Sequence, residues 1–218
     1  MRPVCLIVGT GPGIGQSVAH AFAREGYDIA LASRHPDKLG EFQRELAKTG
    51  VAARAFRADA ADEASLRQLF TDVRRDLGDP EVLVYNPAAH GVGKPMALTG
   101  EKLAADFRVN VTGGLICAQE AARTMKERAR GTILLTGGGF AHEPAANYAS
   151  LSLGKAALRN LAYSLAQELG AWGIHVATVT VYGFVQSGTH YDPARIAEAF
   201  LRLHKQAPGH FQTELVFK

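Results

Sequence analysis

A glycine-rich turn near the start of the chain has the spacing of a phosphate-binding loop. The sequence Gly9-Thr-Gly-Pro-Gly-Ile-Gly15 follows the apolar run Val4–Val8 directly and leads into a helical pattern. Gly9 permits a sharp turn, Gly13 lets the backbone approach a pyrophosphate, and Gly15 allows the helix to pack closely on the strand. The helix N-terminus presents free N–H groups and a positive dipole end. We therefore predict a dinucleotide site here; the alternative is a merely tight turn.

The end of the second strand indicates which dinucleotide is bound. Twenty residues after Gly13, where an acidic side chain would bind the ribose hydroxyls of NAD, the chain has Ser33 followed by Arg34. A serine hydroxyl can hydrogen-bond a 2′-phosphate, and a guanidinium can pair with it through two N–H groups. We expect NADP, with NAD less favoured; the alternative is that Arg34 points into water. Asp59, after the third strand, either accepts a hydrogen bond from the adenine amino group or caps the following helix.

Short apolar runs rich in β-branched residues alternate with longer amphipathic stretches along the whole chain. Runs that are apolar throughout indicate strands buried on both faces, and their alternation with helices implies a parallel sheet with right-handed crossovers. We predict strands at Val4–Val8, Asp28–Ala32, Ala53–Arg57, Val82–Tyr85, Thr132–Thr136, His175–Val181 and Thr213–Phe217. Helices are predicted at Ile14–Glu25, Lys38–Lys48, Glu63–Leu77, Leu103–Arg128, Gly154–Leu169 and Ala194–Leu203.

These elements predict an α/β fold: a single doubly wound, Rossmann-type domain over residues 1–218, with a mostly parallel sheet of about seven strands and helices on both faces. The predicted helix Leu103–Arg128 carries Gly113-Gly114 in its middle. Glycines weaken a helix interior, so this pair indicates close approach to a neighbouring element.

Composition narrows the class of protein. The chain has 218 residues, 47% of them hydrophobic, and a formal charge of +3 from 24 basic and 21 acidic residues that are scattered along it. This pattern favours solvated helix faces over a nucleic-acid footprint. Cys5 and Cys117 stand in apolar runs without metal or disulfide spacing, as expected of a reduced, cytoplasmic protein. The first apolar run is too short for a signal or membrane segment. We expect no metal, membrane or nucleic-acid partner.

With these residues in place, the chain resembles the short-chain dehydrogenase/reductase family over nearly its whole length. Each match is weak by itself, but five occur in order and at appropriate separations. They are the glycine loop Gly9–Gly15, Asn86 in the segment that is usually Asn-Asn-Ala-Gly, Asn110 at the catalytic asparagine, Lys155 at the lysine of the Tyr-x-x-x-Lys motif, and Gly183-Phe-Val185 in the loop that contacts the nicotinamide. Tyr182 replaces the proline that usually begins this last loop.

Two of the family's four catalytic positions lack their functional group in this chain. Leu151 stands four residues before Lys155, where the family has its tyrosine, and Gly138 falls where the family has its serine. The resemblance implies that the tyrosine would exchange a proton with the carbonyl or alcohol oxygen and that the serine would polarise it. Leucine and glycine can do neither. Lys155 would still hold the nicotinamide ribose, and Asn110 a water. Loss of general acid–base catalysis typically costs about 10²–10⁴ in rate.

Other residues near the empty positions are candidates for the missing proton transfer. Tyr148 precedes Lys155 by two helical turns and shares about the same helix face, so its phenol is a candidate; its alternative is packing or an interface. Lys155 itself is an acid if burial lowers its pKa. His142 and Thr136 follow the fifth strand, at the edge where ligands bind. The N–H groups of Gly137-Gly-Gly139 stand in for the serine hydroxyl, unless this segment is only a flexible turn.

We therefore expect an NADP-dependent oxidoreductase that moves hydride to or from a small carbonyl or alcohol, with an altered proton relay. The alternatives are a catalytically weak or inactive NADP(H) sensor, and an isomerase, dehydratase or lyase on the same scaffold. The predicted cofactor site consists of Gly9, Thr10, Gly13, Ile14, Gly15, Ser33, Arg34, Asp59, Asn86, Lys155, Gly183 and Val185, and the predicted catalytic set of Asn110, Lys155 and Tyr148. The resemblance also implies a homodimer or homotetramer joined through the long helix and the helix that carries Lys155.

Overall fold

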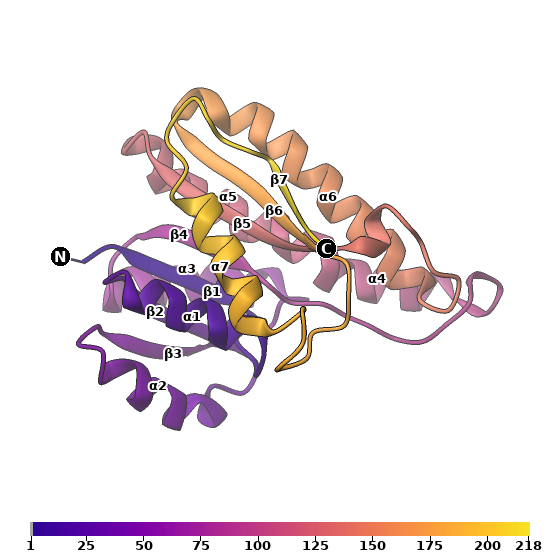
Figure 1. Cartoon of the computed structure of the whole chain (residues 1–218), viewed down its shortest axis with the longest axis horizontal. Helices are drawn as coiled ribbons and strands as arrows, with labels where there is room; N and C mark the ends of the chain where they lie inside the picture. Colours follow the sequence, from indigo (N-terminus) through magenta and orange to yellow (C-terminus); the bar gives the residue numbers. More distant parts are fainter. Residues whose placement is uncertain (1) are drawn as a thin grey trace.

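The described part of the chain is built around one parallel β-sheet. The computed structural model describes residues 2–218. Across the sheet the strands follow the order β3-β2-β1-β4-β5-β6-β7 (Figure 1). Their bounds are Ala53–Arg57 (β3), Asp28–Ser33 (β2), Val4–Val8 (β1), Pro80–Tyr85 (β4), Gly131–Gly138 (β5), Ile174–Val181 (β6) and Glu214–Phe217 (β7). Every neighbouring pair is parallel, as the alternation of apolar runs with helical patterns predicts.

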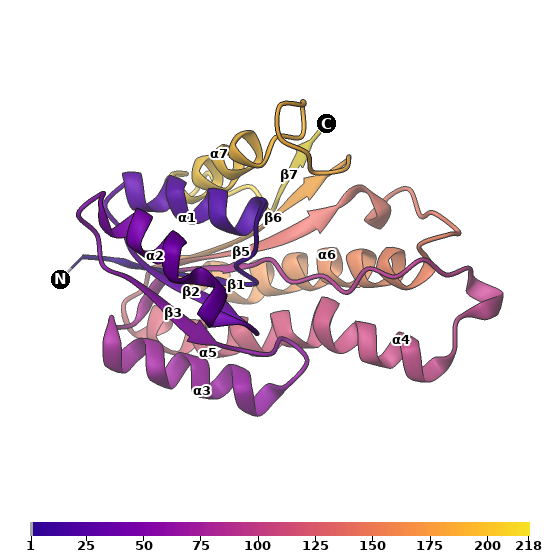
Figure 2. The same cartoon turned by 90° about the horizontal axis from the view of Figure 1, so that it is seen from below.

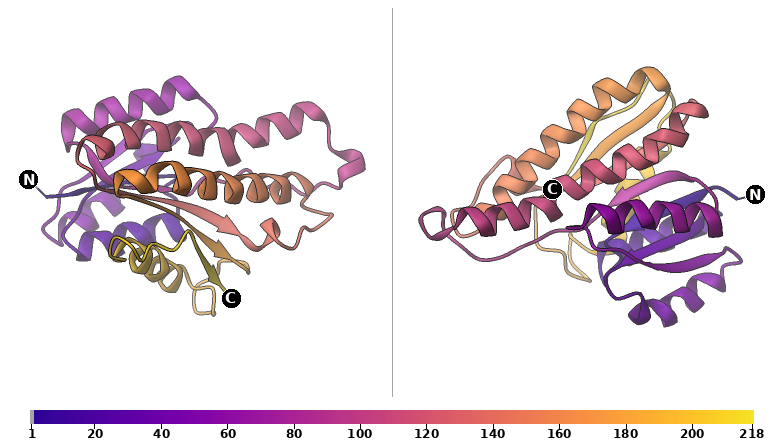
Figure 3. Two further views of the ribbon diagram at one scale, coloured as in Figure 1. Left: turned by 90° about the horizontal axis from the view of Figure 1, so that it is seen from above. Right: turned by 180° about the vertical axis from the view of Figure 1, so that it is seen from behind.

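Helices cover both faces of this sheet (Figure 2). One face carries α1 (Ile14–Arg24), α2 (Gly40–Ala47) and α7 (Pro193–His204), and the other, seen from behind in Figure 3, carries α3 (Glu63–Asp76), α5 (Gly113–Glu127) and α6 (Ala149–Leu169). Two apolar cores result, because successive residues of a strand project to opposite faces. Leu6 of β1 belongs to the core under α3, α5 and α6, whereas Ile7 belongs to the core under α1, α2 and α7. The predicted doubly wound α/β fold is confirmed.

The strand order reverses between β1 and β4, and this reversal sets where a ligand can bind. In doubly wound sheets, ligands lie outside the carboxyl ends of the strands at such a point. The last residues of the two strands, Val8 and Tyr85, are register partners. The segments that follow them, beginning at Gly9 and Asn86, therefore meet at one edge of the sheet.

The stretch predicted as one helix, Leu103–Arg128, consists of two α-helices joined by a π-helical turn. Helix α4 (Gly100–Phe107) leads into π-helical residues Arg108–Thr112, and α5 begins at Gly113. The pattern predicts one helix or nearly so, and the structure departs from a single α-helix only by this π-helical turn, which an amphipathic pattern does not show. Such turns are frequent at functional sites. The predicted close approach is confirmed, because a β-carbon at Gly113 would overlap the Tyr85 hydroxyl.

Helix α6 begins at Ala149, five residues before the predicted start at Gly154. A contact with a distant segment anchors its first turn: the Ala149 N–H donates to the Gly93 carbonyl oxygen at 3.2 Å. Helical periodicity alone carries no sign of this contact. The early start places Leu151 inside the helix. Helix α4 and the first turns of α6 project beyond the carboxyl edge of the sheet (Figure 2).

Both cysteines are buried, as predicted, with Cys5 in one core and Cys117 in the other. Within residues 2–218, none of the helices has the length and apolar character needed to cross a membrane. In the same part of the chain, no group of three or more His, Cys, Asp or Glu side chains is placed to hold a metal ion.

One buried and one half-buried histidine, His175 and His204, lie at the amino edge of the sheet and make the fold sensitive to acid. The His204 ring lies 2.6 Å from the Tyr27 hydroxyl and 2.9 Å from the Thr132 hydroxyl, and the His175 ring stacks on Phe211. Burial lowers the pKa of His204 to about 4 and also lowers the pKa of His175. At pH values between the ordinary histidine pKa and these lowered pKa values, the two histidines bind a proton in the unfolded chain but not in the folded protein.

We expect the free energy of unfolding to decrease as the pH falls from about 6.5 towards 4, with His204 contributing on the order of 2 kcal/mol. Urea unfolding at a series of pH values measures this change. His204→Gln should be less stable at pH 7 and should show a shallower dependence over the same range. An equally steep dependence in that variant would contradict the assignment to His204.

Candidate nucleotide-binding and active site

The turn between β1 and α1 leaves no room for side chains at two of its glycines. A β-carbon at Gly9 would lie 2.8 Å from the Pro87 nitrogen, and one at Gly15 would lie 2.8 Å from the Gly9 carbonyl oxygen. Gly9 and Gly13 have positive φ angles of 86° and 108°, which glycine adopts without strain. By contrast, nothing lies within 4 Å of the β-carbon position at Gly13, the residue that precedes α1. Backbone packs tightly on one side of the turn, and the helix N-terminus faces open space on the other.

A cavity of about 260 Å³ opens beside this turn, at the carboxyl ends of β1, β2, β3 and β4. Five of the predicted cofactor residues line it, namely Gly9, Thr10, Ser33, Arg34 and Asp59. Gly13, Ile14 and Gly15 form the adjoining start of α1, whereas Lys155, Gly183 and Val185 belong to α6 and to the segment after β6. The first five are thus brought together as predicted, and the residues present fit the adenosine and phosphate half of a dinucleotide.

Ser33 and Arg34 form the wall of this cavity at the end of β2. The Ser33 hydroxyl oxygen accepts a hydrogen bond from the His35 N–H at 3.2 Å, so its own hydrogen remains free to donate. Arg34 is exposed, lines the cavity and has no ion pair with any residue in the range 2–218. An oxygen-rich anion therefore meets a hydroxyl donor and a guanidinium here.

The alternative interpretation of Asp59 as a helix cap is wrong. Asp62 caps α3, because its carboxylate accepts from the N–H groups of Ala64 and Ser65 at 2.9 and 3.2 Å. Asp59 instead accepts from the Ala61 N–H at 2.9 Å, within the turn that precedes the helix. The cap is therefore Asp62, three residues beyond the residue considered from the sequence.

Asn86 ties three strands together at the edge of the sheet. Its amide nitrogen donates to the Gly9 carbonyl oxygen at 3.0 Å, and its amide oxygen accepts from the Thr136 hydroxyl at 2.9 Å. The end of β4 is thereby joined to the glycine turn and to β5. Asn86 positions the backbone of the site; direct contact with a cofactor stays a prediction.

Asn110 lies in the π-helical turn and is only 1% exposed. Its amide oxygen accepts from the Ala89 N–H at 2.8 Å, and its amide nitrogen donates to the Ala89 carbonyl oxygen at 3.1 Å. This pairing fixes the segment after β4. Helix α6 packs directly against the same side chain, because a β-carbon at Gly154 would lie 2.8 Å from Asn110 atoms.

Lys155 projects from α6 towards the end of β5 and is 7% exposed. Its Nζ donates to the Thr136 carbonyl oxygen at 2.6 Å. Burial lowers the pKa of this amine to about 8. A β-carbon at Gly138 would lie 3.5 Å from the Lys155 side chain, so the amine stem runs past the position predicted for the family's serine. Desolvation thus brings the pKa of this amine closer to neutral pH; a catalytic role of Lys155 stays a prediction.

Tyr148 immediately precedes α6, and its ring stacks on Phe140 with the centroids 5.4 Å apart. Its phenol makes no hydrogen bond within residues 2–218. These contacts match the packing interpretation of Tyr148; a catalytic role stays a prediction.

The three glycines at the end of β5 are not a flexible turn. Gly137 and Gly138 are paired with Thr180 and Val181 of β6. A β-carbon at Gly139 would lie 2.9 Å from the ring of Tyr182, the residue in the predicted proline position. Gly139 therefore makes room for an aromatic side chain that the family's proline would not require. On the next segment, Gly183 is covered by the Tyr191 ring, and Val185 is 42% exposed.

His142 belongs to a polar cluster that the sequence did not reveal. Its ring lies 3.0 Å from Glu214, which also accepts hydrogen bonds from Arg159, Thr180 and Tyr163. Although burial raises the pKa of Glu214, these hydrogen bonds together lower it to about 2. The only local signal was the spacing of Arg159 and Tyr163 on one helix face; their partner is in β7, more than 50 residues away.

A second missed cluster connects α4 to α6. The Ser150 hydroxyl donates to the Asp106 carboxylate at 2.7 Å, and Lys102 pairs with the same carboxylate. Ser150 precedes Leu151, so this buried contact fixes the first turn of α6 next to the predicted tyrosine position. An isolated Asp in an amphipathic helix pattern gave no sign of its partner.

The geometry agrees with a comparison to known families. Residues 3–192 match the family described as short chain dehydrogenase. The chain belongs to this family. It is 29% identical over 177 residues to 2,3-dihydro-2,3-dihydroxybenzoate dehydrogenase of Bacillus subtilis strain 168, a match that covers 81% of this chain and 68% of that protein. It is 33% identical over 186 residues to a very-long-chain 3-oxoacyl-CoA reductase of Aspergillus terreus, covering 81% and 51% of the two chains.

Solved structures of the family are similar over nearly the whole chain. A metagenomic short-chain oxidoreductase in complex with NADP matches with a TM-score of 0.90 and 26% identity, covering 98% of this chain and 96% of that one. A short-chain dehydrogenase from Rhodopseudomonas palustris matches with a TM-score of 0.91 and 24% identity, covering 100% and 99%. The resemblance to the family is therefore confirmed.

Proposed function

We propose that this short-chain dehydrogenase family member is an NADP-dependent oxidoreductase that interconverts a small carbonyl compound and its alcohol. The observation that carries the proposal is the cavity at the glycine turn, whose far wall presents the Ser33 hydroxyl and the Arg34 guanidinium where an NAD site would present a carboxylate. When bound, the nicotinamide supplies or accepts the hydride. The metagenomic relative in complex with NADP supports the same choice of cofactor.

Lys155 is the proposed proton donor of this altered site. The residue at the predicted tyrosine position, Leu151, has no exchangeable proton, and Gly138 has no side chain. The stem of the buried Lys155 side chain passes the Gly138 position, and burial lowers the pKa of its amine to about 8. In the direction of reduction, the ammonium group gives a proton to the carbonyl oxygen; in the direction of oxidation, the neutral amine takes it from the hydroxyl.

A second candidate function is an NADP(H) sensor with little or no turnover. The specific observation in its favour is that two functional groups are missing at once, at Leu151 and Gly138, while the glycine turn and Lys155 are retained. A panel of carbonyl substrates with NADPH separates the two functions, because both bind the nucleotide and only the oxidoreductase consumes it.

We also propose that this protein is a cytoplasmic homo-oligomer. Its outer α6 surface exposes Leu153, and an apolar cavity of about 730 Å³ lies between α4, α6 and the segment that carries Phe140. A second copy of the chain, packed helix against helix, would cover this surface. The two buried, unpaired cysteines are compatible with a reducing compartment.

Arg34→Ala should weaken NADPH binding by about tenfold to a hundredfold, the range for a lost charged hydrogen bond. NADH binding should change by less than about twofold, since NADH has no 2′-phosphate to lose a contact. Fluorescence titration of both nucleotides measures the two dissociation constants, and NADH serves as the internal control. Tighter binding of NAD(H) than of NADP(H) by the unaltered protein would overturn the proposed cofactor.

The dependence of kcat/KM on pH should reflect the protonation of the Lys155 amine. Because reduction requires the ammonium form, kcat/KM for carbonyl reduction should fall about tenfold for each pH unit above a pKa of about 8. The reverse reaction requires the neutral amine and should rise through the same pH. Lys155→Arg, which keeps the charge, should remove both inflections. Unchanged inflections in that variant would assign the proton to another group.

Leu151→Tyr should restore a phenol at the predicted tyrosine position. We expect NADPH consumption with the best carbonyl of the panel to rise by as much as about 10²–10⁴, the usual contribution of general acid catalysis. Leu151→Phe is the matched control, because it adds the ring without the hydroxyl. Equal rates for the two variants would show that the position does not face the reacting oxygen.

A further inference from the structure

The carboxyl end of β3 carries an arginine directly beside the proposed NADP-selecting residues. Arg57 is the last residue of β3 and is the register partner of Ser33, the last residue of β2. The two strands are tied at this point by a hydrogen bond of 3.0 Å from the Ala58 N–H to the Ser33 carbonyl oxygen. The next residue after Ser33 is Arg34. Ser33 therefore has one arginine beside it on the adjacent strand and another next to it in the chain, at the same edge of the sheet.

Arg57 and Ser33 project to the same face of the sheet. Leu31, two residues before Ser33, and Ala55, two residues before Arg57, both pack into the core under α1, α2 and α7. Because side chains on a strand alternate with a period of two, Ser33 and Arg57 continue these two rows on that face. Neighbouring strands lie about 4.8 Å apart, a distance that an arginine side chain spans.

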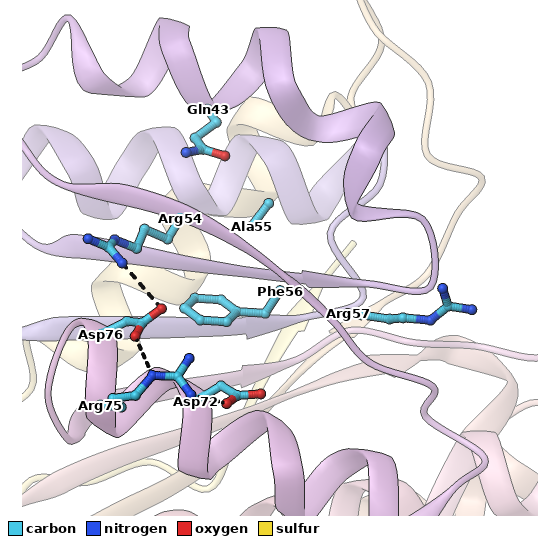
Figure 4. Close-up of a pocket in the computed structure, with 8 residues that line it drawn as sticks. All are labelled: Gln43, Arg54, Ala55, Phe56, Arg57, Asp72, Arg75 and Asp76. Carbon is cyan, nitrogen blue, oxygen red and sulfur yellow. Dashed lines mark hydrogen bonds and ion pairs between the residues drawn. The ribbon is translucent and has the colours of Figure 1, made fainter.

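The other arginines around β3 are already paired, whereas Arg57 is not. A surface cavity of about 500 Å³ beside β3 is lined by Arg54, Arg75 and Arg57. Arg54 binds Asp76 at 3.2 Å, and Arg75 binds Asp72 and Asp76 at 2.8 and 2.7 Å. Figure 4 shows Arg57 extending away from this cluster, along the strand beyond its carboxyl end. Among residues 2–218, no carboxylate forms an ion pair with it.

We propose that Arg57 is the second guanidinium of the 2′-phosphate subsite, where it acts with Ser33 and Arg34 to select NADP. The inference rests on the proposed NADP-dependent function. A phosphate monoester carries a charge of about −1.5 to −2 near neutral pH and has three acceptor oxygens. One guanidinium neutralises only part of that charge, so a second unpaired guanidinium on the adjacent strand completes the match in both charge and donor number.

The test measures binding of nucleotides that differ only at the 2′ position. NADPH, NADH, adenosine 2′,5′-bisphosphate and 5′-AMP are titrated calorimetrically against the unaltered protein and against Arg57→Ala. We expect the variant to bind NADPH and the bisphosphate about tenfold more weakly, and to bind NADH and 5′-AMP within about twofold of the unaltered protein. Arg57→Lys, which keeps the charge but not the planar fork, should recover part of the loss.

Arg54→Ala is the matched control, because Arg54 lies on the same strand but pairs with Asp76. It should leave all four affinities within about twofold of the unaltered protein. Equal effects of Arg54→Ala and Arg57→Ala on NADPH would mean a general loss of positive charge and would overturn the specific assignment. If the unaltered protein prefers NADPH and Arg57→Ala leaves its affinity for NADPH unchanged, this inference is overturned but the proposed function is not. Absence of any preference for NADPH in the unaltered protein would overturn both.

Discussion

Backbone packed directly on backbone at the glycine turn is the constraint on which the site depends. Gly9 lies against Pro87, and Gly15 lies against the Gly9 carbonyl oxygen, at distances that exclude any β-carbon. These contacts bring the start of α1 onto the ends of β1 and β4, so that the helix N-terminus faces the crevice where the strand order reverses. Asn86 holds the arrangement by bonding the Gly9 carbonyl oxygen. A larger side chain at either glycine would have to move a strand or the helix.

The part of the site formed by α6 and the π-helical turn also depends on close packing, although it lacks the tyrosine and the serine of the family's pattern. Gly154 lets α6 approach Asn110, and Asn110 in turn holds Ala89 in the segment after β4. Lys155 follows on the same helix and reaches the Thr136 carbonyl oxygen. Leucine at 151 and glycine at 138 leave these contacts in place, because none of the contacts involves the side chain of either position.

The charge around the cavity depends on which arginines pair with carboxylates as well as on how many arginines are present. On the surface beside β3, Asp76 forms an ion pair with Arg54 of β3, and Asp72 forms one with Arg75 of α3. At the carboxyl edge of β2 and β3, which also carries Asp59, neither Arg34 nor Arg57 forms an ion pair with a residue in the range 2–218, and this edge adjoins the positive end of the α1 dipole. An incoming polyanion thus meets several attractive groups at one edge of the sheet and compensated charge elsewhere along β3.

The layers, the parallel strands and the glycine turn could be predicted from the amino-acid sequence alone. Strands such as Val4–Val8 are buried on both faces and therefore stand out as continuous apolar runs. Gly15 is constrained by the Gly9 carbonyl oxygen, six positions earlier, whereas the contact of Gly9 with Pro87 is long-range and was signalled only by the spacing of the glycine motif. The fold class and the family were accordingly predicted well, and strand ends differed from the structure by at most two residues. The nucleotide-binding and catalytic roles of individual residues follow from this placement and stay predictions.

Tertiary structure decided what depends on contacts between distant segments. Helix α6 starts at Ala149 because Gly93, 56 positions earlier, accepts its N–H group. His142 is held by Glu214, 72 positions away. The same is true of Lys155, whose lowered pKa comes from burial under elements far along the chain. Periodicity and motif spacing describe residues that are close in the sequence. Desolvation and long-range hydrogen bonds exist only once the chain has folded, so the properties of this site that depend on them follow from the tertiary structure.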